Sequence, residues 1–177
     1  MEIICQLVAV SWEDGGMSIV KIITDAPPKS MSPDFAKANG YTWIRRRGGG
    51  WHRDATDEVI AGDIGHRLRP FTSWRRIDPT DIPDDRTFRE AWIDGGTIAV
   101  DMPKARDIHR NRLRAVRAPK LAALDVEQMR ALVSSDTKTV ASIEEQKRAL
   151  RDVPADPAIE AAATPEALAA VMPAALA

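Results

Sequence analysis

The feature that most constrains the fold is a change of pattern at Asp101. Before this residue the chain consists of short apolar runs of strand length, broken repeatedly by Gly, Pro, Asn and Asp. After it, residues 101–177 contain no run with the alternation of a strand, and their apolar residues recur at helical spacing. The sequence therefore predicts an α+β protein: a small mixed strand/helix N-terminal module followed by an all-helical C-terminal arm.

The first residues allow two interpretations. Residues 3–10 and 17–23 are apolar runs separated by a turn-forming segment, which predicts a β-hairpin with Gly15-Gly16 in its loop. Alternatively, Met17 is the natural start and residues 1–16 are an upstream extension, because Glu-Asp-Gly-Gly can be encoded by a purine-rich stretch that resembles a bacterial ribosome-binding site.

We therefore divide the chain into residues 1–16 (extension or first strand), a module over 17–100 and an arm over 101–177 with a frayed Ala-rich tail. In the arm, Asp101-Met102-Pro103 predicts a helix start, Pro119 an interruption or kink, and Ser134-Ser135-Asp136 a break. The elements predicted in the module are strands at 18–23, 41–45 and 73–77, helices at 32–40 and 56–68, and, within 88–100, a strand at Trp92 that turns at 94–96 and returns over 97–100.

Composition excludes several classes of function. Twenty-five Lys and Arg against 26 Asp and Glu give a net charge of −1, which supplies no general attraction to nucleic acid or anionic membrane. The single Cys5 excludes an intramolecular disulfide framework, and no apolar run has the length of a membrane span. The three histidines, His52, His66 and His109, fall in separate elements without metal-ligand spacing. We expect a soluble, non-enzymatic protein with no catalytic site, metal or cofactor.

The arm has a strong charge asymmetry. Residues 101–120 carry seven basic and two acidic side chains, whereas residues 121–177 carry five basic and nine acidic ones. Such a basic helix either pairs with the acidic remainder of a folded-back arm or pairs with an acidic segment of another chain.

Arginine alternates with tryptophan in one segment of the module, and this pattern supports an alternative function. Aromatic and Arg side chains on a hairpin can stack on bases and neutralise phosphates. The competing interpretation is a solvated turn whose tryptophans face the core. The candidate contacts are Trp43, Arg45, Arg46, Arg47, Trp51 and Arg53.

Four segments carry a resemblance to known proteins. PDDRTFREAW at 83–92, DMPKARDIH at 101–109 and RAPKLAALD at 117–125 resemble uncharacterised proteins encoded in bacteriophage and prophage structural-gene regions. KRALRDVP at 147–154 is similar to the C-terminal segment of phage tail-fibre assembly proteins. The resemblance covers about residues 80–170, and the chain departs from it in having no Trp after Leu124-Asp125.

The resemblance implies a chaperone or accessory factor that binds a phage tail or tail-fibre protein in the bacterial host cytoplasm during phage production. A virion component of tail or head is an alternative, and self-association of the chain is another open possibility. The residues expected to contact the partner lie at the junction of module and arm and on the first helix of the arm: Arg86, Phe88, Trp92, Ile108, Arg112, Leu113 and Val116.

Overall fold

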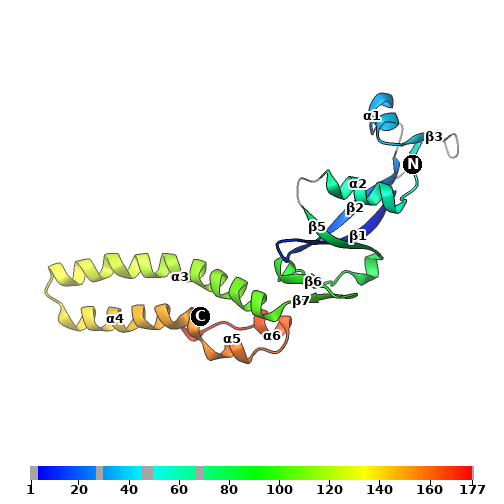
Figure 1. The fold of residues 1–177 in the computed structure, drawn as a ribbon. Helices are drawn as coiled ribbons and strands as arrows, with labels where there is room; N and C mark the ends of the chain where they lie inside the picture. The colour runs from blue at the N-terminus through cyan, green and yellow to red at the C-terminus, as the bar shows by residue number, and fades with distance from the viewer. Residues whose placement is uncertain (1–3, 27–29, 45–49, 67–69, 177) are drawn as a thin grey trace. The chain divides into compact units, whose positions relative to one another are not determined.

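The computed structural model describes residues 4–26, 30–44, 50–66 and 70–176 (Figure 1). The chain forms two compact units, which we call the sheet unit (residues 1–84 and 92–99) and the helical unit (residues 85–91 and 100–177). Strands dominate the first and helices the second, so the predicted α+β class is confirmed.

The sheet unit is built on an antiparallel five-stranded sheet in the order β3-β4-β2-β1-β5. A two-stranded ribbon, β6-β7, follows later in the chain. The strands are β1 (Ile4–Trp12), β2 (Met17–Ala26), β3 (Thr42–Ile44), β4 (Gly50–His52), β5 (Phe71–Ile77), β6 (Trp92–Asp94) and β7 (Ile98–Val100). The helices of this unit are α1 (Pro33–Ala38) and α2 (Asp57–Gly65), and a 3₁₀ turn covers Pro79–Asp81.

The first two strands form the β-hairpin, one of the two interpretations of residues 1–16. Val8 lies opposite Val20, and the Trp12 amide donates to the Gly16 carbonyl at 2.8 Å to close the turn. Gly15 has a φ of 77°, a left-handed conformation that favours glycine. Because β1 pairs with β2 on one side and β5 on the other, residues 4–12 form an interior strand of the sheet.

The core of the sheet unit lies between the sheet and α2. The core residues of β1 (Val8, Val10 and Trp12) and of β2 (Val20 and Ile22) are two residues apart, which places each set on one face of the sheet. Thr56 caps α2 by accepting a hydrogen bond from the Val59 amide at 3.3 Å. The buried cluster comprises Val8, Val10, Trp12, Val20, Ile22, Ile60 and Ile64.

The helical unit is dominated by an antiparallel pair of helices, which lie side by side in Figure 1. These are α3 (Met102–Val133) and α4 (Thr137–Asp152), joined where Ser135 adopts a left-handed φ of 55°. The shorter helices α5 (Pro157–Ala161) and α6 (Pro165–Ala169) follow, with 3₁₀ turns at Arg89–Ala91, Val153–Ala155 and Ala174–Leu176. The predicted break at 134–136 is confirmed, and Asp101 and Asp136 cap α3 and α4.

Three sequence-based expectations need correction. Pro119 does not interrupt α3, because its ring lies on an exposed face where water can bind the carbonyl that loses its amide partner. The Trp92 strand and its return are confirmed as β6 and β7, but the residues before it form a turn whose Phe88 and Ala91 side chains enter the helical core, so 85–91 belongs to the second unit. The tail does not fray throughout, since Leu168 and Leu176 are buried.

Candidate partner-binding surface of the helical unit

The two long helices are held together by a buried lysine. Lys147 on α4 is only 5% exposed, and its Nζ lies 2.5 Å from both Asp125 Oδ1 and Gln128 Oε1 on α3. Glu144 lies 4.0 Å away on α4 itself. A buried ammonium is costly unless such partners surround it, so this network favours one register of the two helices.

The basic side chains of α3 bind the carboxyl ends of the other helices. Arg106 donates to the carbonyls of Ile159, Glu160 and Ala162 at the end of α5. Arg117 donates to the carbonyls of Leu150 and Arg151 at the end of α4. Cationic donors are stabilising there because the last carbonyls of a helix lack intrahelical partners and carry its negative dipole end.

Ion pairs complete this arrangement. Arg110 bridges Asp107, at 2.9 Å, and Glu160. The charge asymmetry of the arm is therefore balanced within the chain at these positions, as the folded-back interpretation predicts.

At the distal end of α3, large apolar side chains are exposed to solvent rather than covered by other parts of the chain. Val126, Met129 and Val133 are 51%, 62% and 85% exposed, and the neighbouring Leu132 is 53% exposed. At 100° per residue, the first three share a face opposite Leu124, Gln128 and Ala131. We call Val126, Met129 and Val133 the distal apolar stripe. Apolar groups gathered in this way are typical of protein-binding surfaces.

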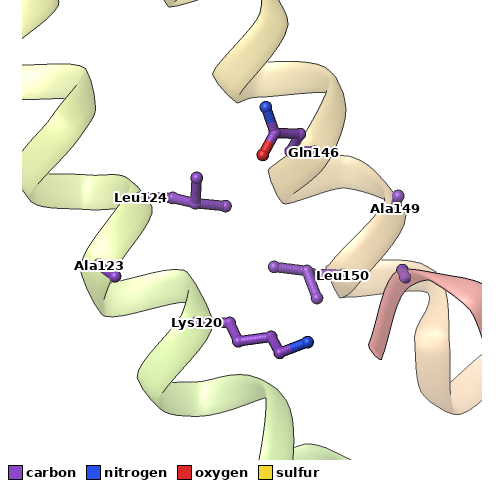
Figure 2. A pocket seen from close by; sticks show the side chains of 7 residues that line it. Lys120, Ala123, Leu124, Gln146, Ala149 and Leu150 are labelled. Atoms are coloured by element: carbon purple, nitrogen blue, oxygen red, sulfur yellow. The ribbon is translucent and has the colours of Figure 1, made fainter. Parts of the chain in front are cut away.

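A shallow groove lies along the seam between α3 and α4 (Figure 2). Leu124 and Leu150 point into the space between the helices, with Gln146 and Lys120 at its edge. The Lys120 ammonium donates to the Leu176 carbonyl at 2.8 Å, so the one charged group of the groove is already engaged. The groove is suited to an apolar side chain rather than to a charged ligand.

The structure separates the predicted partner contacts into exposed and buried residues. Arg86, Arg112 and Val116 are exposed, and the Arg112 guanidinium lies 5.1 Å from the centre of the Phe88 ring. Ile108 is half-buried against the helical core. The remaining three are core residues, which removes them as surface contacts: Phe88 is 1%, Leu113 3% and Trp92, in the sheet unit, 6% exposed. Apolar spacing alone does not distinguish a helix face that packs inside the chain from one that meets a partner.

The Arg-Trp segment is only partly available for nucleic acid. Trp51 is buried and contacts the half-exposed Trp43 edge-on, with ring centres 5.0 Å apart. Arg53 is also buried: its guanidinium lies 4.5 Å from the centre of the Tyr41 ring and pairs with Asp63. Trp51 and Arg53 are therefore packed within the sheet unit, and their burial argues against the proposed nucleic-acid contacts. Arg45, Arg46 and Arg47 lie outside the described residues.

Two histidines have pKa values shifted in opposite directions. His52 on β4 lies 2.9 Å from Asp25 and 3.3 Å from Asp54, and its hydrogen bond to Asp25 raises its pKa above the usual value. His109 on α3 is buried and donates to the Val171 carbonyl at 3.1 Å, and its desolvation lowers its pKa. Across the described ranges, His, Cys, Asp and Glu form no group of three that could hold a metal ion.

Comparisons with protein-family models, curated proteins and solved structures give no match. None of the helices that the structure describes is long and apolar enough to cross a membrane.

Sequence reasoning missed the distal apolar stripe and the buried Lys147. A signal for the stripe was present, because Val126, Met129 and Val133 follow the spacing i, i+3, i+7 on the side opposite Leu124 and Ala131. The sequence carries no such signal for the burial of Lys147, since a lysine on an amphipathic helix is usually exposed.

Proposed function

We propose that this protein is a non-enzymatic accessory factor that binds another protein through the distal apolar stripe. The observation that carries the proposal is the exposure of Val126, Met129 and Val133 together on one face of α3, in a unit that buries its core and pairs many of its charges. Leaving these side chains in water forgoes free energy that burial against a partner would recover, at about 25 cal/mol per Å² of apolar surface.

The resemblance of residues 147–154 to phage tail-fibre assembly proteins suggests the class of partner. We propose a tail or tail-fibre protein, met in the bacterial host during phage production. Subunits of elongated fibres expose apolar and strand-edge surfaces before assembly, and such surfaces aggregate unless they are covered. An apolar stripe can cover them temporarily.

Co-expression with a phage tail-fibre protein tests the proposal. We expect the wild-type chain to increase the soluble yield of the fibre subunit and the Met129→Lys/Val133→Lys variant to lose this effect. The matched control is Glu145→Lys, on an exposed position of α4. Equal activity of the stripe variant and the control would contradict the proposal. Recovery of the chain in purified phage particles would indicate a virion component instead.

Nucleic-acid binding remains a second candidate because Trp43 is 47% exposed beside the arginine-rich segment 45–47. In this case Trp43→Ala, and neutralisation of the three arginines, would each weaken binding to single-stranded oligonucleotides, and wild-type binding would fall steeply with salt. Absence of salt-sensitive binding by the wild type would exclude this candidate.

A further inference from the structure

We propose that the distal apolar stripe pairs with the same stripe of a second copy of the chain, with the two α3 helices parallel. The inference rests on the proposed function, since it names an occupant of the same surface. It implies that a second copy covers the stripe until a partner protein displaces it.

The side chains of the stripe follow the pattern of a parallel two-stranded coiled coil. Val126 and Val133 take the a positions of a heptad, and Ala122 and Met129 take the d positions. A β-branched residue at a with Leu at d favours two parallel helices, and here Met129, a residue of similar volume, takes the d position between the two valines. Each a or d residue would then face its own equivalent in the second copy.

The flanking charges complement each other in the same register. Asp125 takes a g position and Arg130 the following e position, which is the pair that bridges two parallel helices. Asp125 binds Lys147 within the chain, yet its side chain is 62% exposed and can accept a second cation. Arg130 is exposed. An antiparallel pairing would place Leu132 opposite Asp125 and leave both charges without this partner.

The packing of the helical unit leaves room for this association. Leu124, Gln128 and Ala131 lie on the α4 side of α3, so α4 does not cover the stripe. The contact spans only about three helical turns, which is short for a stable coiled coil. The expected dimer is therefore weak and depends on protein concentration.

Sedimentation of the full chain tests the association. We expect wild type to shift from monomer to dimer as concentration rises, and Arg130→Glu to raise the dimer dissociation constant about 10-fold by placing two like charges opposite each other. Arg130→Lys, the matched control, should stay within about 3-fold of wild type. A wild type that stays monomeric at its solubility limit, or a Glu variant that dimerises as tightly as the Lys variant, would overturn the inference.

Disulfide trapping tests the direction of the helices. In a Cys5→Ser background, which removes the natural thiol, Val126→Cys should form a disulfide-linked dimer on mild oxidation, whereas Arg148→Cys on the exposed side of α4 should not. Trapping that requires one copy with Val126→Cys and one with Met129→Cys would indicate antiparallel helices and overturn the parallel register.

The failures of the two proposals differ. A monomeric chain that still protects the fibre subunit through Met129 and Val133 contradicts only the self-association. A dimer trapped at Val126 without any effect of the stripe on the fibre subunit contradicts only the proposed function.

Discussion

The two units of the protein treat their polar groups differently. In the sheet unit, buried or half-buried basic side chains meet carboxylates: Arg53 pairs with Asp63, and His52 lies between Asp25 and Asp54. In the helical unit, Lys147 and Arg110 also meet carboxylates, but Arg106 and Arg117 meet the carbonyls of helix ends, and burial lowers the pKa of His109. The helical unit also leaves its apolar stripe in water. The sheet unit also exposes large apolar residues, but Ile4, Phe35, Trp43 and Ile93 lie on four separate elements, whereas the exposed apolar residues of the stripe share one face of α3.

All five tryptophans lie in the sheet unit, at positions 12, 43, 51, 74 and 92. Tryptophan fluorescence therefore reports on the sheet unit. The helical signal in circular dichroism reports mainly on α3 and α4. The two signals allow each unit to be followed separately.

The largest expected effect is the loss of the helical unit alone in Leu113→Asp. Leu113 is 3% exposed in the helical core, so a carboxylate there would be buried without a partner and cost about 4 kcal/mol or more. The helical signal should collapse while the tryptophan emission and its unfolding transition persist. Val116→Asp, on an exposed position, should change stability by less than about 0.5 kcal/mol. Loss of both signals together in Leu113→Asp would contradict the separation of the units.

Arg53→Ala should destabilise the sheet unit alone, as Leu113→Asp does the helical unit. It leaves Asp63 without its donor, leaves the Ile23 carbonyl with only the hydrogen bond from the Tyr41 hydroxyl, and removes the cation above Tyr41, at a cost of about 2–3 kcal/mol. The tryptophan transition should move to lower denaturant concentration while the helical transition stays in place. An unchanged tryptophan transition would show that the buried pair adds no net stability.

Lys147 allows a finer test of the helical unit. Lys147→Ala should destabilise the α3–α4 pair by about 1–2 kcal/mol, because it removes packing and leaves Gln128 and Asp125 without the ammonium. Lys147→Met, which keeps the apolar stem, should cost less than the alanine variant. Equal losses in chemical denaturation would mean that the charge, rather than the stem, carries the effect.

The smallest expected effect is an opposite pH dependence of the two units between about pH 5.5 and 8. The pKa of His52 is raised by Asp25, so its contribution is fully present below pH 6.5 and is lost as pH rises through the folded value. The pKa of His109 is lowered by burial, so its contribution is present above pH 6.5 and is lost as pH falls toward the folded value.

Denaturation followed by both signals across this range measures the two slopes. His52→Gln should flatten the slope of the sheet unit and His109→Gln that of the helical unit. Slopes of the same sign in the wild type would contradict the opposite environments of the two rings.

The sequence predicted much of the fold because its signals are local. Each of these signals depends only on residues a few positions away. Examples are the glycine of the hairpin turn, the helix caps Thr56 and Asp101, and the break before Asp136. The burial of Phe88 in the helical core could not be predicted, because Leu113 and Ile159, which belong to the same core cluster, are far away in the sequence. Periodicity likewise placed Leu113 on an apolar face without showing that the rest of its own unit covers that face.

The candidate surface was hidden for the same reason. Val126, Met129 and Val133 become recognisable as open only when α4 is seen to occupy the other side of α3. Arg53 shows the converse, because an arginine near tryptophans suggested a nucleic-acid contact until its buried pairing with Asp63 was seen.

Site-specific photo-crosslinking in phage-producing cells tests the central claim most directly. A photoreactive amino acid replaces Met129 in one variant and Glu145, on the exposed side of α4, in the other. We predict crosslinks to protein, whether a tail-fibre subunit or a second copy of the chain, from position 129 and none of comparable yield from position 145. Equal yields from both positions, or no crosslink from position 129, would contradict the assignment of the distal apolar stripe as a protein-binding surface.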